Sequence, residues 1–167
     1  MGILRTVAAA LAVLLSFQTG FAAGLPAPEG RILLTVSGSI GVHNGDGVAQ
    51  FDRDMLMALD WREVRTFTSF TEGEQVFAGP TLQSLLAAVQ AKGSTVNATA
   101  INDYTVQFPT ADAEAHAVLL AMDQNGKPMR VRDKGPIWVV YPLSEKDAAK
   151  QRFDSEMIWQ LDRLLIE

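Results

Sequence analysis

Basic residues beside a Gly-Pro turn are the first candidates for chemistry in this sequence. Arg132 and Lys134 stand in the run RVRDKGP, directly before Gly135-Pro136. A guanidinium, an ammonium and the backbone N–H groups of a turn together suit a bound anion such as phosphate, sulfate or a carboxylate. Charged residues also protect exposed strand edges from pairing, so a solvated hairpin is the alternative interpretation. We favour that alternative for Arg130 and leave both open for Arg132 and Lys134.

Polar and aromatic side chains supply the second candidates. The run Asn102-Asp103-Tyr104 could orient a ligand through hydrogen bonds, with the ring as one wall of a pocket. Asn and Asp also form turns by bonding their own backbone, and the turn is the favoured interpretation. Tyr141, just before Pro142, offers a choice between a pocket hydroxyl and a ring that packs in the core.

Hydroxyl side chains gather at the end of the run WREVRTFTSF. Thr66, Thr68 and Ser69 follow one another closely there, and strand alternation would place Thr66 and Thr68 on one face. Such hydroxyls form either the floor of a pocket or the ordinary surface of a strand. The second interpretation is slightly favoured.

Composition excludes several kinds of site. The chain has no cysteine, so thiol nucleophiles, thiolate zinc sites and iron–sulfur clusters are ruled out. His43 and His116 are isolated in the sequence and show no ligand spacing. The sequence carries no nucleophile-elbow, Walker or dinucleotide-binding motif. A net charge of −5 argues against a nucleic-acid partner.

The elements that must position these residues form an α+β pattern in which strands predominate. The expected strands are residues 31–38, 61–70, 94–102, 104–108, 117–122 and 137–142. Asp123–Gly126 is a hairpin turn that returns into 127–132. The tail 157–166 fits a strand or a helix, and we favour the strand. One domain of about 145 residues is expected, with a core large enough to be stable without disulfides.

Helices are expected at three places. Asp52 is a suitable N-cap for a short helix over 52–60. A longer helix is expected to begin at Gly79-Pro80 and to end at Gly93, and a third covers 144–153. Residues 111–116 form a short acidic helix or turn. Trp61, Trp138 and Trp159 are all expected in the core, with the border of a cleft beside Gln160 as the less favoured alternative for Trp159.

The first 22 residues have the pattern of a signal peptide. Arg5 precedes the apolar run TVAAALAVLLSF, and small residues flank a cleavage position after Ala22. The run is shorter than the ~20 residues that a transmembrane helix needs, although an uncleaved anchor is the alternative. Residues 23–30 then form a linker and 31–167 the folded domain, which we expect to be exported with no membrane span after cleavage.

Four segments in order resemble the oxidoreductase molybdopterin-binding domain, the fold of sulfite oxidases and their periplasmic relatives. They are LLTVSGSI, FAGPTLQSLL, INDYTVQFP and MDQNGKPMRVRDKGPIWVVYP, which together span roughly Ile32 to Pro142. The resemblance implies the sulfite-oxidase-type fold and a molybdenum cofactor held by a cysteine thiolate. This sequence has Phe67, Thr68 and Ser69 where that cysteine is expected, and a hydroxyl would have to lose its proton to replace the thiolate.

We therefore expect a periplasmic binding module without bound molybdenum. It would hold a small anionic or pterin-like ligand, or dock a periplasmic or membrane protein partner. The candidate ligand contacts are Thr66, Thr68, Ser69, Asn102, Asp103, Tyr104, Arg132, Lys134 and Tyr141. The alternative is a molybdopterin-dependent oxidoreductase that grips its cofactor without cysteine ligation, and a structural accessory subunit is a third hypothesis.

Overall fold

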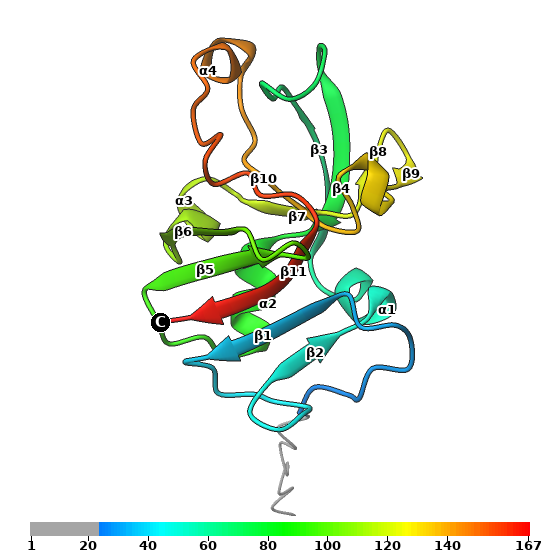
Figure 1. Ribbon diagram of the computed structural model, residues 1–167, viewed down its shortest axis with the longest axis vertical. Helices are drawn as coiled ribbons and strands as arrows, with labels where there is room; N and C mark the ends of the chain where they lie inside the picture. Colours follow the sequence, from blue (N-terminus) through cyan, green and yellow to red (C-terminus); the bar gives the residue numbers. More distant parts are fainter. Residues whose placement is uncertain (1–23) are drawn as a thin grey trace, which may run out of the picture.

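The computed structural model describes residues 24–167, so the predicted signal peptide at 1–22 lies outside the described residues. A five-stranded mixed sheet forms the lower part of the molecule in Figure 1, in the order β2-β1-β11-β5-β6. Its strands are β1 (Leu34–Gly38), β2 (Ala49–Phe51), β5 (Thr95–Ala100), β6 (Thr105–Pro109) and β11 (Leu161–Ile166). The C-terminal strand β11 lies in the middle, parallel to β1 and antiparallel to β5. The C-terminal strand is therefore the central strand of this sheet.

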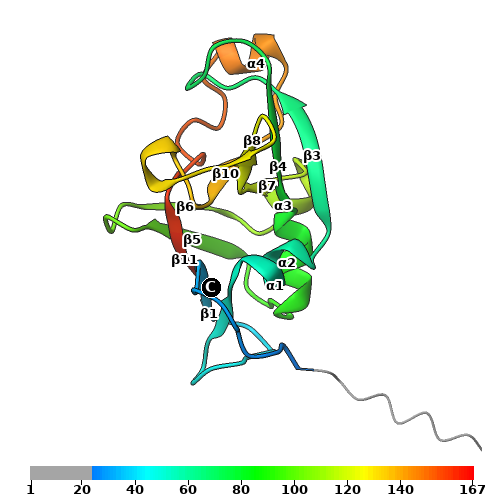
Figure 2. The same ribbon diagram turned by 90° about the vertical axis from the view of Figure 1, so that its right-hand side faces the viewer.

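Helices α1 (Arg53–Met57) and α2 (Leu82–Ala88) lie on one face of this sheet, as Figure 2 shows from the side. Leu82 and Leu85 of α2 are fully buried and belong to the same cluster as Leu34, Val96 and Leu164 of the sheet. The helical spacing of its leucines thus gives α2 one apolar stripe against the strands. Among residues 24–167, no helix is long and apolar enough to cross a bilayer.

A second, antiparallel sheet rises above the first, in the order β3-β4-β8-β9. Its strands are β3 (Trp61–Thr66), β4 (Gln75–Pro80), β8 (Asp123–Gln124) and β9 (Lys127–Pro128). The pair β7 (Leu119–Ala121) and β10 (Trp138–Val140) crosses between the two sheets. Phe77, Leu119 and Trp138 form a separate buried cluster there. The short helices are α3 (Asp112–Ala115), α4 (Glu145–Ala149) and the 3₁₀ turn η1 (Val131–Asp133).

Most of the predicted elements are confirmed, including the C-terminal strand and the hairpin at Asp123–Gly126. The predicted helix start at Gly79-Pro80 is wrong, because these residues end β4 and the helix is capped by Thr81. β2 and β4 were not expected from the residue pattern, although the family segment FAGPTLQSLL implies a strand before the helix. The strand predicted over 127–132 ends at Pro128, and the chain then continues into the turn η1. Trp159 is not in the core, since 39% of its surface is exposed.

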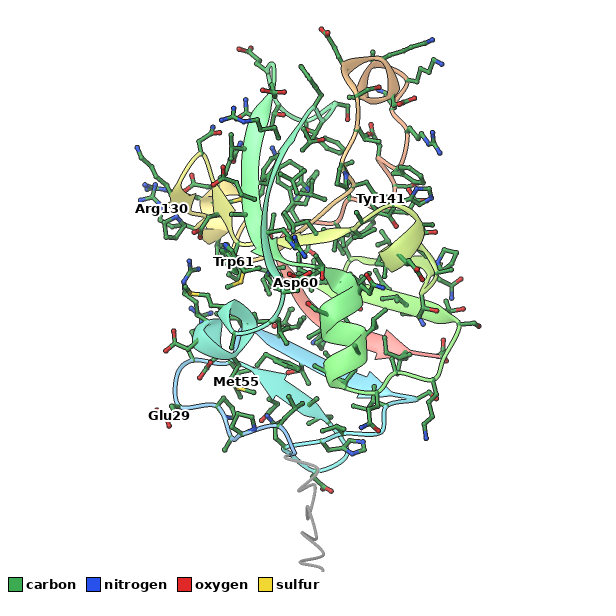
Figure 3. The ribbon with its side chains drawn as sticks, turned by 180° about the vertical axis from the view of Figure 1, so that it is seen from behind. Glu29, Met55, Asp60, Trp61, Arg130 and Tyr141 are labelled. Atoms are coloured by element: carbon green, nitrogen blue, oxygen red, sulfur yellow. The ribbon has the colours of Figure 1, made fainter. Side chains whose placement is uncertain are left out.

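Asp52 caps α1 as predicted, and it also ties the linker to the domain. Its Oδ1 accepts a hydrogen bond of 2.9 Å from the backbone N–H of Met55. Its Oδ2 accepts two of 2.8 Å from the N–H groups of Glu29 and Gly30. Figure 3 shows Glu29 on the chain that runs next to α1, close to Met55 of that helix. Together these donors stabilise the ionised carboxylate and lower the pKa of Asp52, with the bond from Met55 as the largest cause.

We expect acid to weaken the fold partly through Asp52. A carboxyl with a lowered folded pKa contributes stability above its unfolded pKa of ~3.9 and loses it as pH falls through the folded pKa. Asp52→Asn should therefore lower the melting temperature at pH 7 and flatten its fall between about pH 5 and 2. Asp54→Asn, at an exposed position of the same helix, is the control. Equal pH slopes for the native protein and Asp52→Asn would contradict this role.

Candidate functional site

A hollow of about 370 Å³ opens where three chain segments meet. The loop between β3 and β4, the turn between β5 and β6 and the segment between α4 and β11 each form one side. We call it the Trp159 hollow. Its lining residues are Phe70, Ala100, Asn102, Tyr104, Asp154, Ser155, Met157, Ile158 and Trp159. Its volume is within the range of small-molecule sites, and its walls combine apolar surface with a few polar groups, as such sites usually do.

Aromatic rings form the main walls of the Trp159 hollow. Phe70 and Trp159 meet edge to face, with ring centroids 5.3 Å apart. Trp138 stands behind both rings, with its centroid 6.2 Å from that of Phe70 and 6.4 Å from that of Trp159. Tyr104 is 58% exposed and Trp159 39% exposed. Two large rings with that much free surface offer stacking faces to a flat ligand.

Asp154 is the acidic residue of this wall. Its Oδ2 accepts a 2.7 Å hydrogen bond from the Ser69 hydroxyl, which joins the β3–β4 loop to the segment before β11. Its Oδ1 is buried and has no hydrogen-bond partner within residues 24–167. A buried carboxylate oxygen without a donor is costly, so its presence calls for an explanation.

Lys134 holds the aromatic walls together from behind. It ends η1 in a left-handed conformation with a φ of 71°. Its Nζ donates a 3.2 Å hydrogen bond to the carbonyl oxygen of Phe70. The same Nζ lies 4.9 Å from the ring centroid of Trp138 and 5.7 Å from that of Trp159. The ammonium therefore stabilises the rings through cation–π contacts.

Arg132 is on the surface, and it is not among the residues that line the Trp159 hollow. Its side chain is 70% exposed, and its Nε lies 3.8 Å from Asp133. Arg130 makes the closer pair, with Nε 2.8 Å from Asp133, and this bond is the first cause of the lowered pKa of that carboxyl. Arg130 is an exposed charge two residues beyond the end of β9, at the residue before η1, and its side chain makes no capping hydrogen bond there. Gln160 donates from Nε2 to the carbonyl of Val131, so η1 is held next to the chain that follows Trp159.

The run 102–104 forms a turn and also lines the hollow. Oδ1 of Asn102 accepts a 3.2 Å bond from the N–H of Tyr104, and Asp103 has a φ of 65°. Asp103 pairs with Arg163 on β11, which fixes the turn against the sheet. The run is therefore a turn, as favoured, and two of its residues are also placed to contact a ligand. Asn102 and Tyr104 face the hollow, and Asp103 makes the supporting ion pair.

The remaining predicted site residues have structural contacts. Thr66 is fully buried, and its hydroxyl accepts a 2.7 Å bond from the N–H of Leu143. Thr68 bonds Thr71 through the two hydroxyls at 2.8 Å and lies with Ser69 in a more open hollow beside α4. Tyr141 has no exposed surface. The structure therefore does not bring Thr66 or Tyr141 into the Trp159 hollow.

Tyr141 belongs to a polar cluster inside the core. Its hydroxyl donates a 2.9 Å bond to Oδ2 of Asp112, and its ring stacks on Phe153 with centroids 4.4 Å apart. Burial is the largest cause that raises the pKa of Tyr141, followed by the bond to Asp112. Figure 3 shows Tyr141 and Arg130 on opposite sides of the upper sheet. The expected site residues are thus divided between separate regions.

Seven of the nine lining residues were not identified from the sequence, and Phe70, Asp154 and Trp159 are the ones on which the site depends most. Phe70 and Asp154 gave no signal, because a single phenylalanine or aspartate in a loop fits many roles. Trp159 was expected in the core, and the less favoured alternative, that Trp159 borders a cleft beside Gln160, is what the structure has. A larger concavity of about 750 Å³ lies along the β8–β9 hairpin, but it is open and has no aromatic wall.

The comparison with protein families identifies the fold. The family described as the oxidoreductase molybdopterin-binding domain matches residues 53–145, more than half of the chain. The chain belongs to this family. The predicted family and the α+β fold are both confirmed. A comparison with curated proteins found no match.

This molybdopterin-binding domain lacks the donors for a thiolate-bound molybdenum. The chain contains no cysteine, and Phe67, Thr68 and Ser69 stand where the resemblance leads one to expect it. The two hydroxyls are already engaged, with Thr71 and Asp154 respectively. Within residues 24–167, no group of three or more His, Asp or Glu side chains could hold a metal ion. The residues present therefore do not fit the metal centre of the family, whereas the Trp159 hollow is suited to a flat organic ring.

Proposed function

We propose that this molybdopterin-binding domain is an exported binding module that holds a flat, pterin-type ligand in the Trp159 hollow without a thiolate-bound metal. One observation carries the proposal: the hollow is lined by aromatic side chains from three separate segments, Phe70, Tyr104 and Trp159, and two of these rings are well exposed. The family name itself specifies a pterin compound. A domain without the metal donors can still bind the ring system.

The arrangement favours a ring ligand for physical reasons. Stacking on Trp159 and Tyr104 buries apolar surface, and each aromatic pair adds about 0.5–1.5 kcal/mol beyond that burial. Lys134 and Trp138 keep Phe70 and Trp159 in place before any ligand arrives. Walls that are already ordered lower the entropy cost of binding. The hollow is therefore prepared for a rigid, planar molecule.

The anionic ligand expected at the run RVRDKG remains part of the proposal, but only one of the two basic residues is available to it. Arg132 is 70% exposed and its Nε is 3.8 Å from Asp133, so most of its guanidinium is available to solvent anions. Lys134 is committed to Phe70 and the two tryptophans. An anion at this surface would therefore meet Arg132 and not Lys134.

A second candidate function is docking of a periplasmic or membrane protein partner. It rests on four exposed apolar side chains: Tyr104 and Trp159, which line the hollow, and Ile101 and Val131, whose backbones bond to Gln160 next to Trp159. Exposed apolar surface is often covered by a partner. The molybdopterin-dependent oxidoreductase remains the alternative to both binding functions.

The proposed function predicts ligand binding that depends on Trp159. The native domain should bind free pterin, measured by calorimetric titration, and Trp159→Ala should weaken this binding at least about tenfold through lost stacking. The variant also loses the contacts of Trp159 with Phe70 and Trp138, so its melting temperature should fall and binding is measured at a temperature where it is fully folded. The protein should also be purified from the periplasm of a host that makes the molybdenum cofactor. Its molybdenum and pterin contents should then be measured.

Trp61→Ala is the matched control, because Trp61 begins β3 and is not among the residues that line the hollow. It should leave pterin binding unchanged. Stoichiometric molybdenum in the purified native protein would overturn the binding-module proposal in favour of the oxidoreductase. No binding of pterin by the native domain would also overturn it, and a search for a protein partner would then follow.

A further inference from the structure

We infer that the edge strand β3 is a self-association surface, which pairs antiparallel with β3 of a second copy of this chain. The inference is independent of the proposed function, since no residue of β3 lines the Trp159 hollow. β3 stands at one end of the upper sheet, and Figure 2 shows it at the outer margin of the molecule. With six residues and no proline, it is the longest of the edge strands β2, β3, β6 and β9. Such an edge is a template for pairing with another chain.

The backbone bond at the start of β3 shows which of its groups face outward. Asp60, just before the strand, accepts through its carbonyl a 3.0 Å bond from the N–H of Thr81, which follows β4. Backbone groups alternate in direction along an antiparallel strand, so those of Glu63 and Arg65 point away from β4. Among residues 24–167, the N–H and carbonyl groups of these two residues have no backbone partner, and both residues are exposed.

The free part of this edge ends at Arg65. Phe67, the next residue whose groups point outward, donates a 3.3 Å bond to the carbonyl of Leu143. This bond agrees with the alternation, because a group directed at β4 could not reach Leu143. A second copy of the chain can therefore bond to the backbone at Glu63 and Arg65, and the edge beyond them is already occupied.

Charge selects one register for the second copy. Two opposite residues of an antiparallel pair exchange hydrogen bonds only where the groups of both face outward. A register that places Glu63 opposite Glu63 of the second copy, or Arg65 opposite Arg65, sets like charges against each other and is destabilising. The register centred on Val64 instead places each Glu63 opposite an Arg65 of the other copy. It is therefore the register that joins both exposed residues with opposite charges.

The side chains of β3 are available for this pairing. Glu63 forms no ion pair within residues 24–167. Arg65 has a loose one, with Nη1 3.7 Å from Glu74 and 68% of the side chain exposed. Val64 is half-buried and would lie opposite its own copy at the two-fold axis. Two-fold symmetry makes each of the other contacts twice, as in other isologous dimers.

The dimer should be weak, because only two residues of each copy offer free backbone groups. An interface of this length belongs to the class below ~1,200 Å² that is typical of transient complexes. We expect a dissociation constant of roughly 10–100 µM. Sedimentation velocity of the native protein purified from the periplasm should show monomer at about 1 µM and mostly dimer at about 500 µM.

Two charge-reversal variants test the register. Glu63→Arg leaves only arginine at the pairing positions and Arg65→Glu leaves only glutamate, so each should weaken its own dimer at least about tenfold. An equimolar mixture of the two variants brings opposite charges to both positions and should associate with about the native affinity. The double variant Glu63→Arg/Arg65→Glu exchanges the charges and should also dimerise.

Asp46→Arg is the matched control, because it changes the net charge as Glu63→Arg does. Asp46 is exposed in the loop between β1 and β2, in the other sheet, so this variant should dimerise like the native protein. A native protein that stays monomeric at about 500 µM overturns the inference. A dimer that survives in a Glu63→Arg variant shown to be folded by circular dichroism also overturns it. So does a mixture of the two folded variants that fails to associate. Pterin binding is measured separately, so none of these results decides the proposed function.

Discussion

Gly79→Ala is expected to destabilise the domain by at least ~3 kcal/mol, the upper part of the usual range for overpacked cores. Gly79 is buried near the end of β4, where β7 crosses closest to it. A Cβ at this position would collide with the carbonyl oxygen of Leu120, lie 2.8 Å from its carbonyl carbon and 3.0 Å from Cα of Ala121. These atoms are backbone, so the strands themselves would have to separate.

Denaturant unfolding measures this effect directly, and Gly24→Ala is the matched control. A Cβ at Gly24 would meet nothing within 4 Å. The control should change the free energy of unfolding by less than ~0.5 kcal/mol, as is usual for surface substitutions. A folded Gly79→Ala variant with native stability would mean that β4 and β7 do not cross as closely as the structure has them.

Gly79 also shows where sequence analysis failed. A Gly-Pro pair before a leucine-rich run is typical of a helix start, and the run itself was correctly predicted as a helix. The glycine is needed for a different reason, the close approach of β7, which joins residues about 40 positions apart. Local patterns predict caps and turns such as Asp52 and Asn125-Gly126. They do not reveal contacts between distant strands.

The candidate site was predictable only in part, for the same reason. Asn102 and Tyr104 were identified from their residue types, and the structure places both in the lining of the hollow. Asp154 and Phe70 become neighbours only after the β3–β4 loop meets the segment before β11, through the bond between Ser69 and Asp154. Tyr141 was a candidate because tyrosine is common in sites, yet its hydroxyl has a partner inside the core. Residue types suggested which side chains could contact a ligand, but only the fold shows which of them already have a partner inside the protein.

The second large effect is expected at Trp138. Its ring has no exposed surface and packs edge to face on Phe77 at 5.2 Å, while its Nε1 donates a 3.0 Å bond to the carbonyl of Met157. Trp138→Ala should cost about 3–5 kcal/mol, as do other truncations of large buried aromatics. For a domain of this size, the melting temperature should fall by roughly 10 °C. A total stability of ~5–15 kcal/mol leaves such a variant close to unfolding.

Trp138→Phe divides this cost between packing and hydrogen bonding. Phenylalanine keeps an aromatic ring between Phe70 and Phe77 but leaves the carbonyl of Met157 without its donor, so a loss of about 1–3 kcal/mol is expected. The loss should also reach the ligand site, because Trp138 supports both Phe70 and Trp159 from behind. Pterin binding should therefore weaken in Trp138→Phe even at temperatures where the variant is fully folded. Unchanged binding in that folded variant would mean that Lys134 alone is sufficient to hold the two rings in place.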